Sequence, residues 1–310
     1  MTLSLCDLPE DILCEISKRL PTTDDVLSLQ TAHPKISTKI NRTFWRSPKS
    51  LCLSADGEII PHLIFDETKQ MTFSRPTWPR LLAVLTKVKN LKELVLGDCG
   101  KYFSEEILFQ ALIFFQKSKE IKLQKIYAFY QNPDKFFQEE KKDVWPTKGT
   151  HIQLCKLVEK SGKSLLFLLL GLNNSDEFVS ISRNSISDSK IQIQYCHQPT
   201  FDSRSAVFYP LLNGFAKGCS EIKSLTIRMK MIPSMANIIL DHCVQCCFPA
   251  HSESPLEDIT VTFTAMHEKE ENSAEKTKVA RFTNFHNARN LKSLVWIFDV
   301  SVSFIFNIYI

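Results

Sequence analysis

The sequence is poor in glycine and lacks the motifs that nucleotide-binding and hydrolytic enzymes commonly carry. Only 8 of its 310 residues are glycine, which leaves little room for a glycine-rich loop around a phosphate. The segment Ser161–Ser164 ends like a phosphate-binding loop, but Leu157 stands where that loop needs its first glycine. Neither Gly-x-Ser-x-Gly nor Gly-x-Gly-x-x-Gly occurs, and the His residues are scattered. We therefore expect a protein that is not an enzyme and that needs no cofactor.

Charge of one sign is scarce as well. The net charge is +4, which is too small to indicate a nucleic-acid surface, and no basic stripe with interleaved aromatic residues stands out. Most of the ten cysteines are isolated, as is typical of small buried residues in a reducing compartment. The sequence therefore predicts a cytoplasmic or nuclear protein, or one found in both places.

One cluster has metal-like residue types, and it consists of Cys243, Cys246, Cys247, His242 and His251. A structural zinc site usually closes with a second ligand pair at finger-like spacing, and no second Cys-x-x-Cys exists. The spacing of Cys243 and Cys246 continues an apolar helical stripe over residues 234–247. Core packing is our interpretation and zinc binding is the alternative, so we expect no metal.

Long apolar runs are also missing. Acidic Asp7, Glu10 and Asp11 come before any apolar run of signal-peptide length. The C-terminal run 294–310 is apolar but has only 17 residues with Asp299 inside, whereas a spanning helix needs about 20. Its β-branched and aromatic bias favours a strand at 294–298, followed by an added strand or a loosely packed tail. We expect no membrane association, with a membrane anchor as the alternative.

The N-terminal 45 residues carry a helical pattern. Leu8, Ile12, Ile16 and Leu20 recur every four residues, which predicts one apolar face of a helix. Leu13 widens this face, Asp7 and Glu10 have capping-box spacing, and Pro21 ends the helix. Thr22 or Thr23 can cap a second helix that contains Val26, Leu27 and Leu29. Pro34 fits the start of a third, whose stripe is Ile36, Ile40 and Phe44.

Three such short helices cannot bury all of these faces on each other, so one face needs the rest of the chain or a partner. The residues Leu8-Pro9-Glu10-Asp11-Ile12-Leu13, Ile16, Leu20, the segment 24–29 and Phe44-Trp45 resemble the F-box. That module ties a substrate receptor to a Skp-family adaptor and, through it, to a cullin. The match is weaker after residue 30, because 31–36 lacks the Val-Cys-basic element and Trp45 comes late. An ordinary three-helix start to a globular domain is the alternative.

The resemblance implies a set of adaptor-binding residues, namely Leu8, Pro9, Ile12, Leu13, Ile16, Leu20, Val26 and Leu27.

A second pattern, Leu-x-x-Leu-x-Leu with aliphatic or aromatic replacements, recurs after Pro79. It occurs at 91/94/96, 165/168/170, 222/225/227, 256/259/261 and 291/294/296, with weaker strands at 121/123 and 191/193. Helical patterns at 104–117, 150–160, 203–217 and 234–247 lie between the strands, and Pro210 should kink or shorten the third. Strand-helix units of this length stack into a solenoid because none can bury its own apolar face. The pattern resembles degenerate leucine-rich repeats, and an unrelated α/β domain is the alternative.

The sequence thus predicts an α/β protein with an F-box-like module at 1–46, an ordered linker with a strand or two at 47–79, and a repeat domain at 80–310. Leu94, Leu168, Leu225, Ile259 and Leu294 should form one buried ladder.

The two resemblances together imply a non-catalytic substrate-recognition subunit of a cullin-based ubiquitin ligase, whose repeats bind a protein target. An adaptor-bound scaffold without a role in ubiquitination, and an enzyme on an α/β domain, are the alternatives.

Overall fold

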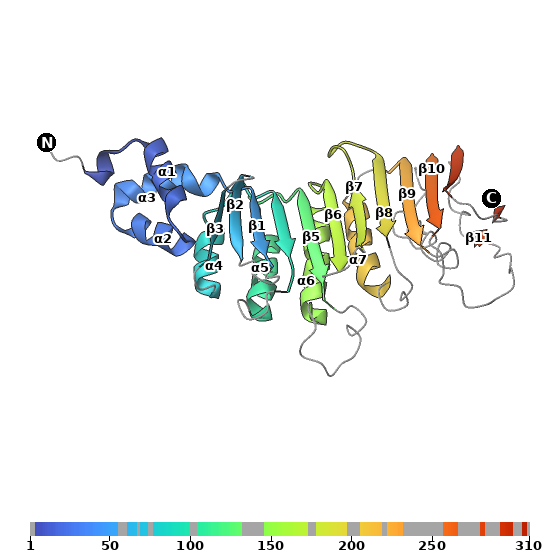
Figure 1. Ribbon diagram of the computed structural model, residues 1–310, viewed down its shortest axis with the longest axis horizontal. Coiled ribbons are helices and arrows are strands. Elements are labelled where there is room, and N and C mark those ends of the chain that lie inside the picture. The colour runs from blue at the N-terminus through green and yellow to red at the C-terminus, as the bar shows by residue number, and fades with distance from the viewer. Residues whose placement is uncertain are drawn as a thin grey trace. The chain divides into compact units, whose positions relative to one another are not determined.

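The chain is a mixed α/β protein, and a computed structural model describes it in two compact units (Figure 1). Unit 1 comprises Met1–Gln131 with Trp145–Gln153, and unit 2 comprises Asn132–Val144 with Leu154–Ile310. The described residues are 4–54, 61–66, 69–73, 77–98, 104–131, 146–172, 178–196, 205–218, 222–231, 257–265, 280–282, 292–299 and 306–308. The structural statements below concern these residues.

Unit 1 begins with three short α-helices flanked by 3-10 turns. These elements are η1 (Leu5–Asp7), α1 (Glu10–Arg19), α2 (Thr23–Thr31), α3 (Pro34–Arg42) and η2 (Phe44–Arg46). Thr22 caps α2 in a capping box with Asp25, and Pro34 opens α3 in its first turn. Both features were predicted. The predicted cap of the first helix is wrong: Ser4 and Asp7 form a capping box on η1, and α1 follows Pro9 without a side-chain cap.

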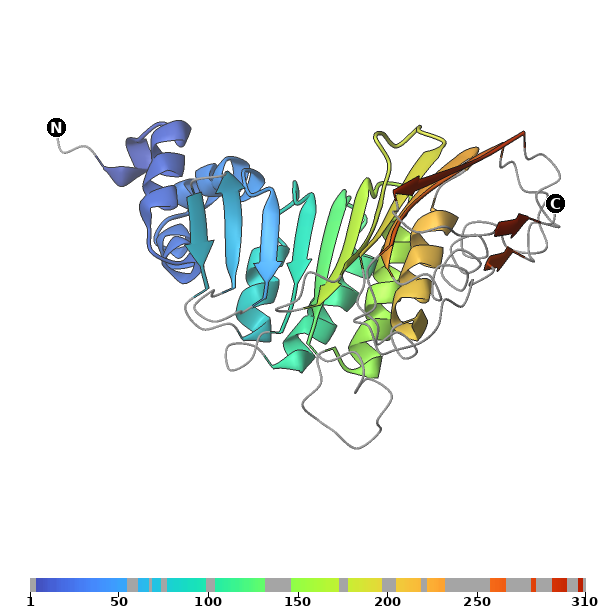
Figure 2. The same ribbon diagram turned by 45° about the vertical axis from the view of Figure 1, so that its right-hand side comes forward.

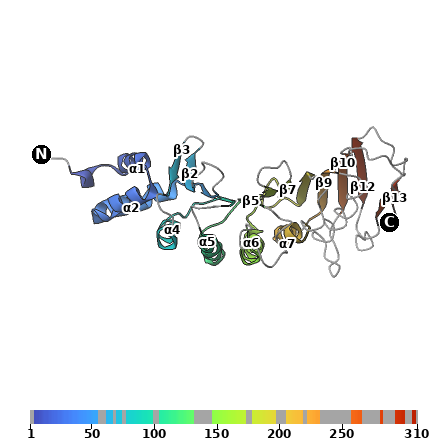
Figure 3. The ribbon, with the colours of Figure 1, turned by 60° about the horizontal axis from the view of Figure 1, so that its bottom comes forward.

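Unit 1 continues as a sheet in the order β3-β2-β1-β4-β5 (Figure 2). The strands are β1 (Ser50–Leu53), β2 (His62–Asp66), β3 (Lys69–Thr72), β4 (Glu93–Leu96) and β5 (Lys125–Tyr130). β1, β4 and β5 run parallel, while β2 and β3 are antiparallel to their neighbours. The two helices α4 (Trp78–Leu85) and α5 (Glu105–Lys117) lie on one side of this sheet (Figure 3).

The segment 47–79, predicted to be an ordered linker, therefore supplies three strands and the start of α4. The three N-terminal helices pack directly against it. A β-bridge joins Thr22 to Thr72, and the rings of Phe44 and Phe65 lie 5.0 Å apart. The Asn90 side chain donates a hydrogen bond to the Arg46 carbonyl at 2.8 Å. The helices and the first strands consequently share one core.

Unit 2 contains a sheet in the order β6-β7-β8-β9-β10-β12. The strands are β6 (Phe167–Leu172), β7 (Phe178–Ser182), β8 (Lys190–Cys196), β9 (Ser224–Met231), β10 (Asp258–Ala265) and β12 (Ser293–Asp299). Helix α7 (Ser205–Lys217) lies between β8 and β9 in the chain, and α6 (Lys148–Ser161) begins in unit 1 and ends in unit 2. A short parallel pair, β11 (Ala280–Phe282) with β13 (Phe306–Ile308), forms separately.

The helices predicted at 104–117, 150–160 and 203–217 are confirmed as α5, α6 and α7, and α7 continues through Pro210 from Ser205 to Lys217. The strand predicted at 294–298 is confirmed as β12, which pairs in parallel with β10. The prediction of a strand at 121/123 is wrong, because the strand starts at Lys125, and the Leu-x-x-Leu-x-Leu spacing there falls on Leu123, Ile126 and Ala128. The region 234–247, with its cysteine cluster, lies outside the described residues.

The predicted ladder of five residues holds only in part. Leu225, Ile259 and the Leu294 backbone are register partners, and Leu94 pairs with Ile126 in unit 1. Leu168 is one row away, because it pairs with Ile181 in a row that continues to Ile193 and Ile227. The cause is β7, which is antiparallel to both β6 and β8, so that it departs from the parallel strand-helix alternation and sets its own register.

Candidate functional site

The N-terminal helices expose an apolar face, and helical geometry explains which one. Leu13, Cys14 and Ser17 are the buried residues of α1. Each residue turns the helix by about 100°, so Ile12 and Ile16 point well away from this buried side. Ile12 is 44% exposed and Ile16 is half-buried. The apolar stripe that the sequence suggested is therefore largely not the side that builds the protein's own core.

Two of the eight predicted adaptor-binding residues are corrected by this arrangement. Leu13 and Val26 are both fully buried. Their side chains hold α1 and α2 in the core of unit 1, so they cannot present a surface to a partner. Leu8, Ile16, Leu20 and Leu27 are half-buried, and Pro9 is exposed.

A further exposed apolar residue precedes the stripe. Leu5, on η1, is 41% exposed and was not among the predicted site residues. We define the N-terminal apolar face as Leu5, Leu8, Ile12, Ile16 and Leu20. Apolar surface of this kind is worth roughly 25 cal/mol per Å² when a partner removes it from water. The face is thus suited to protein contact and not to chemistry on a small molecule.

The start of this face is held in place by Lys39 on α3. The Lys39 ammonium donates hydrogen bonds to the carbonyl oxygens of Cys6 at 3.0 Å and Leu8 at 2.6 Å. A cation at the C-terminal end of a helical turn also interacts favourably with its carbonyl groups. The segment that carries Leu5 and Leu8 is therefore ordered before any partner binds. The role of Lys39 was not predicted from the sequence. The turn that it contacts has a local sequence signal, because Ser4 and Asp7 have the spacing of a capping box.

The far side of the three helices is fixed by aromatic packing and by a buried hydrogen-bond chain. The rings of Phe44 and Trp45 meet edge to face at 4.8 Å, and both residues are fully buried. The indole nitrogen of Trp45 donates to the Gln30 side-chain oxygen at 3.1 Å, and the Gln30 amide donates to the Asn41 oxygen at 2.6 Å. Trp45, although late in the sequence pattern, thus closes the core that supports the apolar face.

Charged side chains also lie on α1, the helix that carries the middle of the apolar face. Glu10 lies 3.5 Å from Arg42, and Glu15 lies 2.8 Å from Lys18. The hydrogen bond from Lys18 lowers the pKa of the Glu15 carboxyl, so this group stays charged near neutral pH. A polar rim around an apolar centre is the usual composition of a protein–protein interface.

Two buried titratable groups elsewhere, His151 and Cys155, are uncharged near neutral pH. His151 contacts the Tyr130 hydroxyl at 3.0 Å, and burial lowers the pKa of His151 to about 4, so its ring is neutral. Burial raises the pKa of the Cys155 thiol to about 12, which leaves it protonated and unreactive. Among the described residues no group of three or more His, Cys, Asp or Glu side chains could hold a metal ion.

Within the described part of the chain, no helix combines the length and the apolar character that crossing a membrane requires. The sequence matches no protein-family model, and no curated protein resembles it significantly. The functional argument consequently depends on the residues and contacts described above.

Proposed function

We propose that this chain is a non-catalytic substrate receptor of a cullin-based ubiquitin ligase. The N-terminal apolar face docks a Skp-family adaptor, which brings in the cullin, and the sheet units hold a protein target. The observation that carries the proposal is the division of α1 into two sides. Leu13, Cys14 and Ser17 build the core, while Ile12 and its neighbours leave apolar surface open on a segment with the F-box pattern.

The role is one of proximity. A receptor that binds adaptor and target together makes the attack of a target lysine effectively intramolecular. No catalytic group is required of the receptor for this. The closed hydrogen bonding of the three-helix core and the Lys39 contacts favour a rigid docking surface, which reduces the entropy that binding must offset.

The test is adaptor copurification with the full chain carrying Ile12→Asp. Docking would bury a carboxylate in an apolar contact, so we expect the adaptor to be lost from the purified complex. The double variant Leu8→Ala with Pro9→Ala should weaken binding by about tenfold, since it removes one apolar side chain and the turn residue beside it.

Ile152→Asp is the matched control, because Ile152 is 43% exposed on α6 and lies outside the apolar face. It should retain the adaptor fully. Undiminished copurification with folded Ile12→Asp protein would refute the docking proposal and leave the α/β enzyme as the better hypothesis. Adaptor binding without any change in the turnover of a bound target would instead favour the scaffold alternative.

A further inference from the structure

The strands of unit 2 have one buried side and one side turned toward solvent. The buried side consists of Ile191, Ile193, Leu225, Ile227, Ile259 and Val261. The residues between them point the other way, as alternation along a strand requires. We define the outward face as Gln192, Gln194, Thr226, Arg228, Lys230, Thr260, Thr262 and Thr264. Its long side chains are exposed and its threonines are half-exposed.

The register places these side chains in rows across three strands. Gln192, Thr226 and Thr260 form one row, and Gln194, Arg228 and Thr262 form the next. Lys230 and Thr264 are partners in the third row. Neighbouring rows are two residues, or about 6.6 Å, apart along the strand. The centre of the face thus has two cations, one row apart, among neutral hydrogen-bonding groups.

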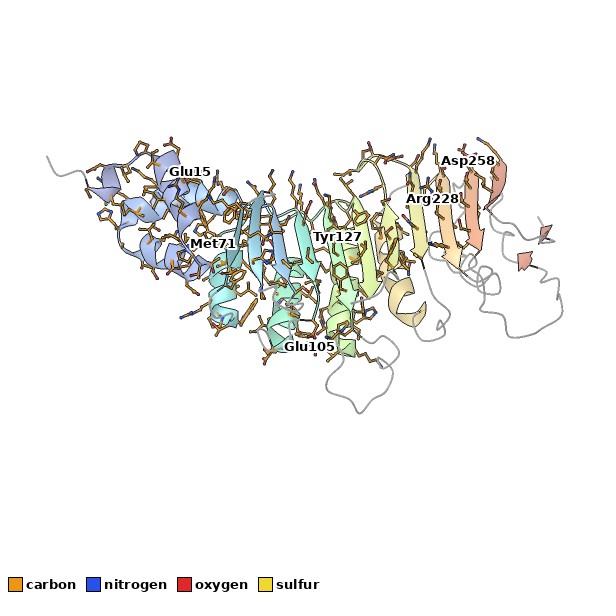
Figure 4. All side chains as sticks on the ribbon, viewed as in Figure 1. Glu15, Met71, Glu105, Tyr127, Arg228 and Asp258 are labelled. Atoms are coloured by element: carbon orange, nitrogen blue, oxygen red, sulfur yellow. The ribbon has the colours of Figure 1, made fainter. Side chains whose placement is uncertain are left out.

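No ion pair among the described residues neutralises these two cations. The carboxylate residue in their rows is Asp299, which follows Thr264 in the third row and lies two strands, or about 9.5 Å, from Lys230. The cross-strand neighbours of Arg228 are Gln194 and Thr262, and neither cation lies in an ion pair with a described residue. Asp258 is at the start of β10, four residues in register before Arg228 (Figure 4). That separation is about 13 Å along the strand, beyond the roughly 8 Å over which salt leaves charges coupled.

Two other charged positions on the sheets are paired with a charge of opposite sign. At the strand starts of unit 2, Glu257 lies 2.7 Å from Lys292. On the solvent-facing side of the unit 1 sheet, Lys125 lies 2.7 Å from Glu93, which also accepts a hydrogen bond from Ser50 at 2.9 Å. Two like charges one row apart repel each other. A negative group that arrives from outside would relieve this repulsion.

We propose that the outward face of unit 2 binds an extended acidic segment of a partner protein, with two carboxylates at positions i and i+2. An extended chain repeats its side chains on one side every 6.6 Å or so, the same interval that separates Arg228 from Lys230. The Arg228 guanidinium donates to both oxygens of one carboxylate, and Lys230 donates to the other. Gln192, Gln194 and the threonines offer hydrogen bonds to the backbone of the segment.

A protein segment fits this face better than a nucleic acid does. A nucleic-acid strand presents a phosphate charge at every nucleotide and needs a longer run of cations than two. The inference names the class of target that the proposed receptor would hold. It rests on the proposed function only in calling the bound segment a target. The binding itself needs no adaptor.

The probe is a labelled nine-residue peptide, Gly-Thr-Ser-Glu-Thr-Glu-Ser-Thr-Gly, titrated with the full chain at low salt without adaptor. A second peptide replaces both glutamates with glutamine, and a third has the same composition with the glutamates five positions apart. We expect the first peptide to bind about tenfold tighter than the second, since two charge-assisted contacts are lost there. The third should fall between them.

Arg228→Gln with Lys230→Gln should abolish the preference, while Arg228→Glu with Lys230→Glu should reverse it toward a lysine version of the peptide. The control is Lys156→Gln with Lys163→Gln, which removes two exposed cations of unit 2 away from the outward face and should leave binding unchanged. Equal binding of the glutamate and glutamine peptides would overturn the proposal. So would tighter binding of a nine-nucleotide single-stranded DNA that depends on Arg228 and Lys230. Because adaptor is absent, neither result depends on the docking of the N-terminal helices.

Discussion

Arg183 is the buried charge whose removal should damage unit 2 most. It follows β7 and is 5% exposed. Its guanidinium donates to the carbonyl oxygens of Leu165 at 2.7 Å, Gly162 at 2.7 Å, Lys163 at 2.9 Å and Ile186 at 3.2 Å. It also lies 5.8 Å from the centre of the Phe215 ring. One side chain therefore joins the end of α6, the start of β6, the loop after β7 and helix α7.

The expected cost of Arg183→Met follows from these contacts. A hydrogen bond to a charged group contributes roughly 1.5–3 kcal/mol net, and four are lost. The simple sum overestimates the effect, because the wild-type protein also bears a desolvation cost of several kcal/mol for burying the guanidinium. We expect a loss of about 3–4 kcal/mol in the free energy of unfolding, a large part of the 5–15 kcal/mol typical of a domain. Arg183→Lys should lose about 2 kcal/mol, because one ammonium cannot reach four carbonyls.

The assay is denaturant unfolding of the full chain, with hydrogen exchange followed separately in peptides from unit 1 and unit 2. The denaturant midpoint should fall, and hydrogen exchange should become faster in peptides from unit 2. Exchange in the N-terminal helices should remain near the wild-type rate. Arg42→Met is the control, since Arg42 is largely exposed and its 3.5 Å pair with Glu10 is worth under about 1 kcal/mol. If the free energy of unfolding of Arg183→Met lies within about 0.5 kcal/mol of the wild-type value, the four hydrogen bonds of Arg183 do not stabilise unit 2 as argued.

Three further predictions concern single residues. Lys39→Met should speed hydrogen exchange in residues 5–9 by about tenfold and weaken adaptor binding, with the rest of unit 1 unchanged. Gly218→Ala should cost about 2 kcal/mol in denaturant unfolding, because its methyl group would collide with the Gly162 backbone between α6 and α7. His151 has a folded pKa of about 4, below the unfolded value near 6.5, so its stabilisation is complete above 6.5 and is lost as pH falls toward 4. The free energy of unfolding of the wild type should therefore fall by up to about 3 kcal/mol between pH 6.5 and pH 4 because of this group. His151→Gln should lack this part of the fall, as measured by unfolding at each pH.

Sequence periodicity was sufficient for elements with a strong apolar repeat. The Leu-x-x-Leu-x-Leu pattern located β4, β6, β9, β10 and β12, because a parallel strand covered by helices needs buried aliphatic residues at alternate positions. It was insufficient for β7, whose five residues include two serines, and for the start of β5, where Ala128 occupies a leucine slot. Helix α4 was not predicted, because Pro79 was interpreted as part of a proline-containing linker. In the structure this proline lies in the first turn of the helix, where proline is tolerated.

The candidate site divides in the same way. The apolar stripe of α1, the capping of α2 by Thr22 and the start of α3 at Pro34 were readable locally, because capping and helical spacing depend on residues within one turn. Which side of the stripe is buried was decided by contacts of α1 with α3 and with the Phe44–Trp45 turn, far along the chain. Those contacts took Leu13 into the core and left Ile12 in solvent.

Only the tertiary structure shows the hydrogen bonds of Lys39 to the N-terminal segment and the rows of side chains on the outward face of unit 2. Lys39 reaches carbonyls 31 and 33 residues earlier in the chain. Arg228 and Lys230 form an unbalanced pair of positive charges only because β8 and β10 place neutral side chains beside them. A sequence determines local conformation through interactions a few residues apart, whereas the charge balance and exposure of a surface depend on neighbours that only folding brings together.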